Sequence, residues 1–97
     1  DYRRIQNMEV FFQRNALSLI TSFKSTDAKN LEQWFPGDVV FFDMNKDGYT
    51  DNVGIISDST TRNGTPKVIY NYIEPGYTTE ENILESKIIT GHYRYPR

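Results

Sequence analysis

One short segment carries oxygen-bearing side chains at alternate positions. They are Asp43, Asn45 and Asp47, followed by Gly48 and then by Asp51. This spacing can wrap a hard cation such as calcium, which takes about six to eight oxygen ligands. Gly54 occupies the position where an EF-hand loop counted from Asp43 has a bidentate glutamate. The sequence therefore predicts a calcium site with an incomplete set of ligands.

The same segment is also typical of a hairpin loop that binds no ion. Asp and Asn side chains in such loops accept hydrogen bonds from nearby backbone N–H groups, and a glycine such as Gly48 supplies a positive φ. Carboxylate-rich turns of this kind are common. Both interpretations of the segment from Asp43 to Asp51 stay open at this point.

The numbers of cysteine and histidine residues limit the nucleophilic catalysis that these residues could perform. It contains no cysteine, which excludes disulfides, thiolate zinc sites and a cysteine nucleophile within these residues. The one histidine, His92, lies between Gly91 and Tyr93, where a hydrogen-bonded structural role is commoner than a catalytic one. We therefore predict no nucleophile–base pair within the chain.

Asn52 stands at the head of a predicted strand, beside the acidic loop, and is placed to face a cleft. Its amide donates and accepts hydrogen bonds but takes no proton at neutral pH, so it is a poor general base. Its alternative role is simply to close a hairpin. Asp51 and Gly54 flank the same strand entrance.

Two strands must position these side chains. Residues 39–42 and 53–56 are continuous runs of β-branched and aromatic residues, broken only by Gly54, which suits buried strands. The connection between them is short, which predicts an antiparallel hairpin. Gly54 inside the second run indicates that another group approaches the backbone closely.

An N-terminal helix is predicted over about residues 7–15, with Asn7 as its N-cap. Ile5, Met8 and Phe12 share one apolar stripe. Residues 17–23 alternate only in part, so strand, irregular segment and helix all stay open. Residues 25–30 are predicted to form a polar loop and residues 31–35 a short turn.

Two more strands are predicted after the hairpin, over residues 67–73 and 87–95, with a bulge at Gly91. Between them we predict a turn at residues 74–77 and, over residues 79–84, either one helical turn or a polar loop. These elements indicate the α+β class, with one helix followed by a small antiparallel sheet.

Composition narrows the range of partners. The chain has 97 residues and a formal net charge of −2, which suits one small domain and makes nucleic acid an unexpected partner. No apolar run is long enough to cross a bilayer, so we expect no membrane span. Seven tyrosines and six phenylalanines favour a β-rich core, and an aromatic-lined groove is the alternative.

Several motifs occur here in the order seen in the DUF1287 family, which the chain resembles over nearly its whole length. They are Arg3-Arg4-Ile5-Gln6-Asn7-Met8, Phe11-Phe12-Gln13-Arg14, Pro36-Gly37-Asp38-Val39-Val40, Val53-Gly54-Ile55-Ile56-Ser57-Asp58, Val68-Ile69-Tyr70-Asn71 and Ile89-Thr90-Gly91-His92-Tyr93-Arg94-Tyr95. That family is similar to the NlpC/P60 and CHAP cysteine peptidases and amidases of bacterial cell walls. The closing Thr-Gly-His-Tyr-Arg-Tyr is the most specific of these motifs.

The resemblance implies a papain-like core, in which a cysteine at the N-terminus of a helix packs on an antiparallel sheet. It implies that residues 1–97 are one domain, the C-terminal part of a longer one whose nucleophile-bearing helix lies upstream of Asp1. In the family, histidines stand at the positions of Asn52 and Tyr70, and often at that of Tyr2. Asn71 and His92 then become neighbours of the site, with Asp51 and Gly54.

Two functions follow as expectations. One is a fragment of a cell-wall cysteine amidase or endopeptidase, acting on peptidoglycan peptides and inactive as it stands. The other is a non-catalytic module that binds a cell-wall peptide or a protein partner on the same scaffold. The resemblance also implies a bacterial cell-envelope or secreted location, and an upstream segment that completes the fold.

Overall fold

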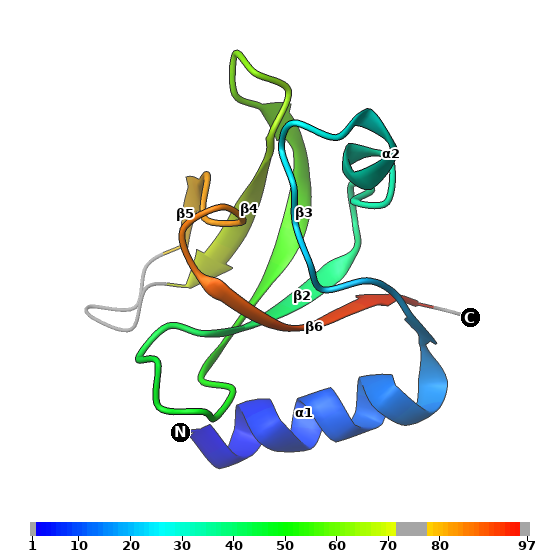
Figure 1. Ribbon diagram of the computed structural model, residues 1–97. Helices are drawn as coiled ribbons and strands as arrows, with labels where there is room; N and C mark the ends of the chain where they lie inside the picture. The colour runs from blue at the N-terminus through cyan, green and yellow to red at the C-terminus, as the bar shows by residue number, and fades with distance from the viewer. Residues whose placement is uncertain (1, 72–77, 96–97) are drawn as a thin grey trace.

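The computed structural model describes residues 2–71 and 78–95, and in these the chain builds one antiparallel sheet with a long helix across one face (Figure 1). The elements are α1 (Tyr2–Asn15), β1 (Leu17–Ser18), α2 (Ala28–Leu31), β2 (Val39–Asp43), β3 (Asn52–Thr60), β4 (Pro66–Asn71), β5 (Thr78–Glu81) and β6 (Ile88–Arg94). The strand order is β1-β6-β2-β3-β4-β5. The predicted α+β class, with an N-terminal helix and an antiparallel sheet, is confirmed.

The central hairpin joins β2 to β3, as the two apolar runs predict. Val40 pairs with Gly54 and Phe42 pairs with Asn52. Because side chains alternate along a strand, these four residues point to one face of the sheet, which we call the loop face. The intervening residues of both strands point to the opposite face, which carries α1 and which we call the helix face.

β6 completes the centre of the sheet by pairing with the other edge of β2. The register shifts there, since Phe41 pairs with Gly91 and Phe42 pairs with Ile89. Thr90 is thus the extra residue of a bulge, beside the predicted position at Gly91. The other edge of β6 pairs with the short strand β1.

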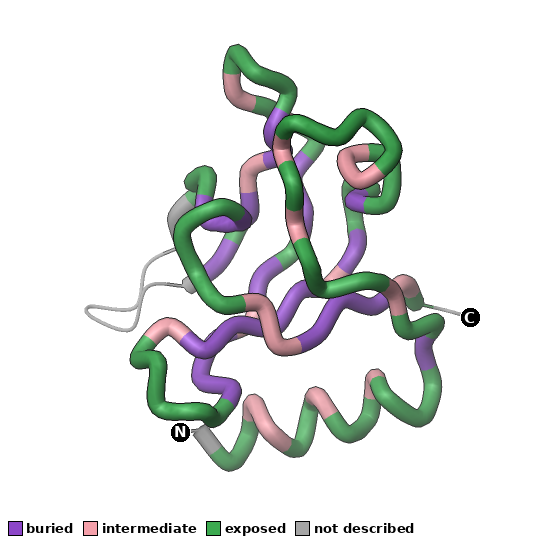
Figure 2. Tube along the Cα trace, viewed as in Figure 1, coloured by how far each residue is buried: buried purple, intermediate pink, exposed green. Residues whose placement is uncertain are grey.

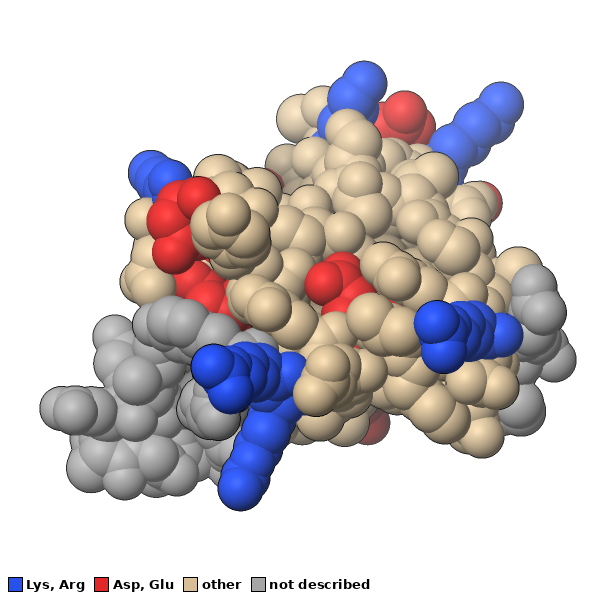
Figure 3. Space-filling view, turned by 90° about the horizontal axis from the view of Figure 1, so that it is seen from below, with Lys and Arg blue, Asp and Glu red and all other residues tan. Residues whose placement is uncertain are grey.

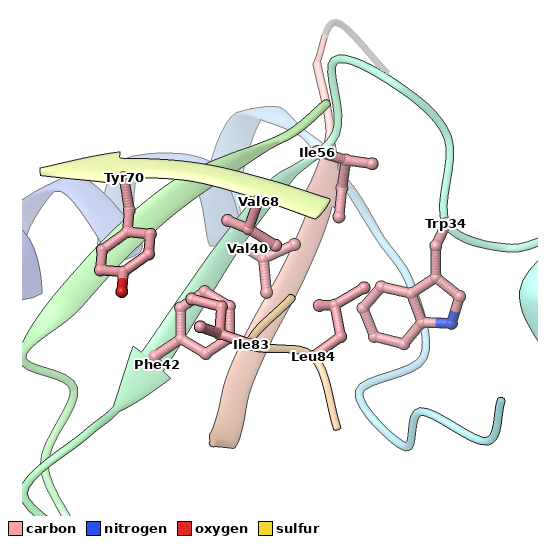
Figure 4. Close-up of a cluster of buried hydrophobic side chains, with 8 residues drawn as sticks. All are labelled: Trp34, Val40, Phe42, Ile56, Val68, Tyr70, Ile83 and Leu84. Atoms are coloured by element: carbon pink, nitrogen blue, oxygen red, sulfur yellow. The ribbon is translucent and has the colours of Figure 1, made fainter. Parts of the chain in front are cut away.

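Apolar side chains are buried on both faces of the sheet, most densely along β2, which Figure 2 shows as a buried strand. On the helix face Ile5 and Phe12 of α1 pack against Ala16, Phe41 and Tyr93. The larger cluster fills the loop face (Figure 4) and consists of Trp34, Val40, Phe42, Ile56, Val68, Tyr70, Ile83 and Leu84. The segments that carry Trp34 and Ile83–Leu84 close over the loop face.

The predicted start of the helix is wrong, since α1 begins at Tyr2 and Asn7 lies inside it. An asparagine is a common N-cap, but it is also tolerated on the exposed side of a helix, where Asn7 lies. Ile5 and Phe12 pack on the sheet as their spacing predicts. Met8, on the same stripe, is 41% exposed.

Residues 17–18 form β1, which is one of the alternatives that the sequence left open. Two short elements differ from prediction. The first is α2, which begins in the segment predicted as a loop, where Asp27 caps it by accepting from the Lys29 N–H at 3.0 Å. Residues 78–81 form β5, where one helical turn or a polar loop was predicted over residues 79–84, because the edge of β4 supplies backbone partners for them. The turn predicted at residues 74–77 and the end of the strand at 72–73 lie outside the described residues.

Candidate functional site

Asn52 and Tyr70 lie on the loop face of neighbouring strands. Tyr70 on β4 pairs with Gly54 of β3, two residues along from Asn52, so the two side chains are diagonal neighbours on one face. Asn52 is 5% exposed and Tyr70 is 6% exposed. The Tyr70 hydroxyl donates to the Glu81 carboxylate at 2.6 Å, and the Asn52 amide donates to Asp51 at 3.4 Å.

Gly54 allows the crowding at this position. A Cβ added to Gly54 would lie 2.4 Å from Cγ1 of Val68, 3.0 Å from the carbonyl oxygen of Ile69 and 3.2 Å from Cβ of Tyr70. At distances this short a residue other than glycine fits only if the atoms of β4 shift. The close approach predicted from a glycine inside an apolar run is therefore present, and the approaching groups come from β4.

Neither Asn52 nor Tyr70 can serve as a base toward a thiol at neutral pH. An amide has no basic lone pair to take a proton, and a phenol ionises only near pH 10. Ser57, five residues along the chain from Asn52, donates its hydroxyl to the Glu80 carboxylate, which is a hydrogen bond between a serine and an acid without an intervening imidazole. The pair of positions can orient a ligand through hydrogen bonds, but it cannot activate a nucleophile.

His92 lies away from this pair. His92 stands on β6 and pairs with Val40, on one edge of β2. Asn52 stands on β3 and pairs with Phe42, on the other edge of β2. β2 therefore separates the histidine from Asn52. The sequence placed His92 beside the site, and the structure places it in a different group of buried side chains.

That group is centred on Asp38, which sequence reasoning missed as a site residue. Arg94 binds both of its carboxylate oxygens, through Nε at 2.8 Å and through a terminal nitrogen at 2.9 Å. His92 Nε2 lies 2.7 Å from Oδ2 of Asp38. Asp38 is 2% exposed and His92 is fully buried. Burial raises the pKa of Asp38, but the hydrogen bonds from Arg94 and His92 outweigh it and hold the pKa below its usual value.

One signal in the sequence pointed to this group. His92 and Arg94 are two residues apart on a strand and so share one face, and Asp38 directly precedes the strand that pairs with theirs. The pairing register between β2 and β6, however, cannot be read from the sequence. Because both partners of the carboxylate are on β6, the group ties that strand to the turn before β2.

The acidic loop brings three of its predicted ligands together. One carboxylate oxygen from each of Asp43, Asp47 and Asp51 lies within 4.8 Å of the others. These three side chains, with Asn45 in the same loop, are the residues that could hold a cation. Oxygen atoms that accept one hydrogen bond retain a second lone pair for a metal ion.

The same carboxylates also hold the backbone of the loop. Asp51 accepts from the N–H groups of Met44 and Asn45, both at 2.9 Å, and Asp43 accepts from the N–H of Gly48 at 2.8 Å. Burial raises the pKa of Asp43, but the hydrogen bonds from backbone N–H groups outweigh it and lower the pKa. The loop therefore has the bonding that was predicted for a hairpin loop without an ion.

A groove opens on the helix face, beside α1. It has a volume of about 360 Å³ and is lined by Met8, Phe12, Val39, Val53, Gly54, Ile55 and Ile69. Ile55 is 49% exposed and Ile69 is 39% exposed. Figure 3 views the molecule from the side of α1 and shows a broad uncharged surface there, with separate charged side chains. This apolar groove was not predicted from the sequence.

The remaining predicted site residues are distributed between these features. Asp51 is buried at the entrance of β3, where it bonds the acidic loop. Gly54 adjoins Tyr70 and also lines the groove. Asn71 is the last residue of β4. Among the residues that the structure describes, none of the helices is long and apolar enough to pass through a bilayer.

Comparison with known proteins identifies the family. The model of the domain of unknown function DUF1287 matches residues 1–95. The uncharacterized protein YijF of Escherichia coli strain K12 is 37% identical over 95 residues, which cover 98% of this chain and 42% of YijF. The chain thus spans less than half the length of that relative. No solved structure matches the chain. On the extent of the family match, the chain belongs to the DUF1287 family.

Proposed function

We propose that this chain is the sheet-bearing part of a papain-like domain of the NlpC/P60 type that recognises peptidoglycan peptides, and that it is not catalytic by itself. The observation that carries the proposal is the position of Asn52 and Tyr70 as diagonal neighbours on one face of the sheet. Both are buried on one face of β3 and β4, at the two positions where the resemblance implies histidines. The antiparallel sheet with a helix across it is compatible with such a core.

The chemistry of the pair supports the absence of catalysis. A cysteine peptidase needs a thiolate, which an adjacent imidazole generates by taking the thiol proton. The chain has no cysteine, and Asn52 and Tyr70 offer an amide and a phenol at the relevant face. More than half of YijF lies outside the matched region, so a nucleophile from another segment of the natural protein is part of this proposal.

The groove on the helix face favours a second candidate, a module that binds a partner without any catalytic role. Its exposed lining is aliphatic, with Met8, Ile55 and Ile69 in contact with solvent. Such a lining suits the apolar side of a peptide or of a protein segment, including a segment that completes the domain. The two candidates use opposite faces of the sheet, so substitutions can separate them.

Histidine substitutions test the first candidate. The natural protein that carries this sequence is compared with its Asn52→His variant and with the Asn52→His/Tyr70→His double variant, using release of peptides from purified peptidoglycan. A gain of turnover in the variants supports a lapsed hydrolase, because an imidazole at Asn52 could accept the proton of a thiol. Asn52→Gln is the matched control, since it keeps an amide and should gain nothing.

A groove substitution tests the second candidate. Ile55→Asp places a charge on the exposed lining, where Ile55 is 49% exposed and its change disturbs little of the core. Loss of sedimentation with peptidoglycan in Ile55→Asp, together with no turnover in the histidine variants, supports the binding module. Sedimentation that is unchanged in Ile55→Asp, with turnover in Asn52→His, supports the hydrolase instead. Asp58→Asn, at an exposed position on the same strand, is the control for surface changes.

A further inference from the structure

The hairpin of β3 and β4 ends in an exposed turn that carries the one Asn-Gly pair of the chain, Asn63-Gly64. Gly64 donates its N–H to the carbonyl oxygen of Thr61 at 3.0 Å, which closes a four-residue β-turn with Arg62 and Asn63 at its centre. Figure 1 shows this turn projecting from the top of the molecule, and Figure 2 shows that its tip is exposed. The Asn-Gly pair is therefore open to water.

An asparagine that precedes a glycine can react with its own backbone. The backbone nitrogen of the glycine attacks the side-chain carbonyl carbon, and a C–N bond forms. The bond from that carbon to the side-chain nitrogen breaks, and this nitrogen leaves as ammonia with the proton of the attacking N–H. Water then opens the five-membered succinimide ring at either of its two carbonyl groups, which gives aspartate or isoaspartate. Asparagine is a thermolabile residue for this reason.

The surroundings of Asn63 and Gly64 leave room for this attack. A Cβ built on Gly64 would have no heavy atom within 4 Å, and its φ of +86° is one that glycine adopts without strain. Among the residues that the structure describes, none forms a hydrogen bond with the Asn63 side chain. The hydrogen bond that must break is the one from Gly64 to Thr61. It lies in an exposed turn, where local opening costs little free energy.

The acidic loop contains a comparable pair, Asp47-Gly48, and the structure protects it. The Gly48 N–H donates to Oδ2 of Asp43 at 2.8 Å, and Oδ1 of Asp47 accepts from the Tyr49 N–H at 3.0 Å. Both the attacking nitrogen and the attacked group are thus held by other partners. An ionised carboxylate is also a poorer electrophile than an amide, so we expect this pair to stay intact.

The other asparagines are less reactive for two different reasons. Asn15 precedes the small residue Ala16, but its side-chain amide donates to the carbonyl oxygen of Phe11 at 2.9 Å. The remaining asparagines precede residues larger than alanine, whose side chains crowd the attacking nitrogen. Asn63 alone combines an exposed turn, a following glycine and a side chain that is free to rotate toward the backbone.

We propose that Asn63 is a site of spontaneous covalent modification, at which ammonia is lost and the turn acquires an isoaspartyl bond that loosens the end of the hairpin. Isoaspartate inserts one extra carbon atom into the backbone, between Cα of residue 63 and the nitrogen of Gly64. The Thr61 N–H donates to the carbonyl oxygen of Thr65 at 2.9 Å, and Thr65 is 1% exposed. A longer backbone between these two residues strains that closure of the loop.

Peptide mapping by mass spectrometry tests the modification. The protein is incubated at mildly alkaline pH and digested at mildly acidic pH, where the ring forms slowly. We expect Asn63 to convert to aspartate and isoaspartate at a rate within about tenfold of that in a free peptide of residues 61–66, because the exposed turn opens readily. Asn63→Gln is the matched control, since glutamine closes its larger ring much more slowly. An Asn63 that keeps its amide while the free peptide reacts would overturn the proposal.

Backbone hydrogen exchange tests the effect on the hairpin. Chromatography of the incubated protein separates the isoaspartyl form, and Asn63→Asp supplies the same added charge without the extra backbone carbon. We expect the Thr61 N–H to exchange faster in the isoaspartyl form than in Asn63→Asp, because its hydrogen bond to Thr65 closes the loop. Equal exchange of this N–H in the two proteins would show that the longer backbone leaves the hairpin unchanged, against the proposal.

Discussion

Arg94 on β6 and Asp38, the residue before β2, form a two-point ion pair with nitrogen–oxygen distances of 2.8 and 2.9 Å. The carboxylate is 2% exposed, while the guanidinium side chain remains 33% exposed. The guanidinium also lies 4.2 Å from the centre of the Phe35 ring. One carboxylate thus organises the turn before β2, the end of β6 and the buried histidine.

Replacement of Asp38 by Asn should destabilise the fold strongly. The amide cannot accept from both Arg94 and His92 in the present geometry, so a buried ring would lose its charged partner. Removing one member of a buried ion pair costs about 3 kcal/mol. The measurement is the free energy of unfolding in urea. Asp58→Asn, at an exposed position, is the control, and an Asp38→Asn variant as stable as that control would contradict the role of the network.

The same carboxylate predicts loss of stability in acid. Its pKa is lowered in the folded chain, so the unfolded chain binds more protons in the range between the folded value and about 3.9. Stability from Asp38 is present above about pH 4 and declines as the pH falls through the folded value. Thermal melts from pH 5 to pH 2 should show this decline, and in Asp38→Asn the acid dependence should be shallower. If the melting temperature falls equally steeply with pH in the unmodified chain and in Asp38→Asn, the loss of stability in acid comes from groups other than Asp38.

Gly54→Ala should destabilise the sheet by about 1–3 kcal/mol, as overpacking does. The added Cβ would lie 2.4 Å from Cγ1 of Val68, and 3.0 Å from a backbone oxygen that cannot turn away. The Gly54→Ala/Val68→Ala double variant removes the nearest atom, so its loss of stability should be less than the sum of the two single losses. If the loss of unfolding free energy in the double variant equals the sum of the two single losses, the contact between the added Cβ and Val68 contributes nothing, which would contradict the prediction.

Calcium should raise the melting temperature if the acidic loop holds it. The ligand oxygens of Asp43, Asp47 and Asp51 already lie within 4.8 Å, and a ligand that binds only the folded chain stabilises it. Melts in millimolar calcium and in chelator give the comparison. Asp47→Asn is the chosen control because it removes one charge from an exposed residue and should reduce any shift. Identical melting temperatures in calcium and in chelator would contradict a calcium site, and the role of the carboxylates would then be to accept the backbone hydrogen bonds of the loop.

The local patterns of the chain predicted the central strands well. The runs at residues 39–42 and 53–56 are β-branched and aromatic, and their pairing was confirmed because the short acidic loop permits little else. Gly54 signalled a close approach because a side chain at this position would have to displace atoms of β4. The strands at β4 and β6 were recognisable from the same kind of run.

Features that depend on long-range register were not predictable in this way. The association of Asp38 with His92 and Arg94 spans more than half of the chain and depends on a bulge at Thr90. β5 has a polar sequence and forms because the edge of β4 offers it backbone partners. The groove on the helix face depends on how α1 crosses the sheet, which the amphipathic pattern of the helix leaves undetermined.

The central claim is that this chain lacks a proton acceptor at Asn52 and so does not hydrolyse peptidoglycan peptides. The most direct measurement incubates the purified 97-residue chain with peptidoglycan and analyses the released peptides by mass spectrometry. We predict no release above the buffer control. In the natural protein we predict that Asn52→His, and more so Asn52→His/Tyr70→His, gains release where a cysteine is available. Clear turnover by the unmodified 97-residue chain would contradict the claim, because it would require a nucleophile and a base other than the cysteine–histidine pair.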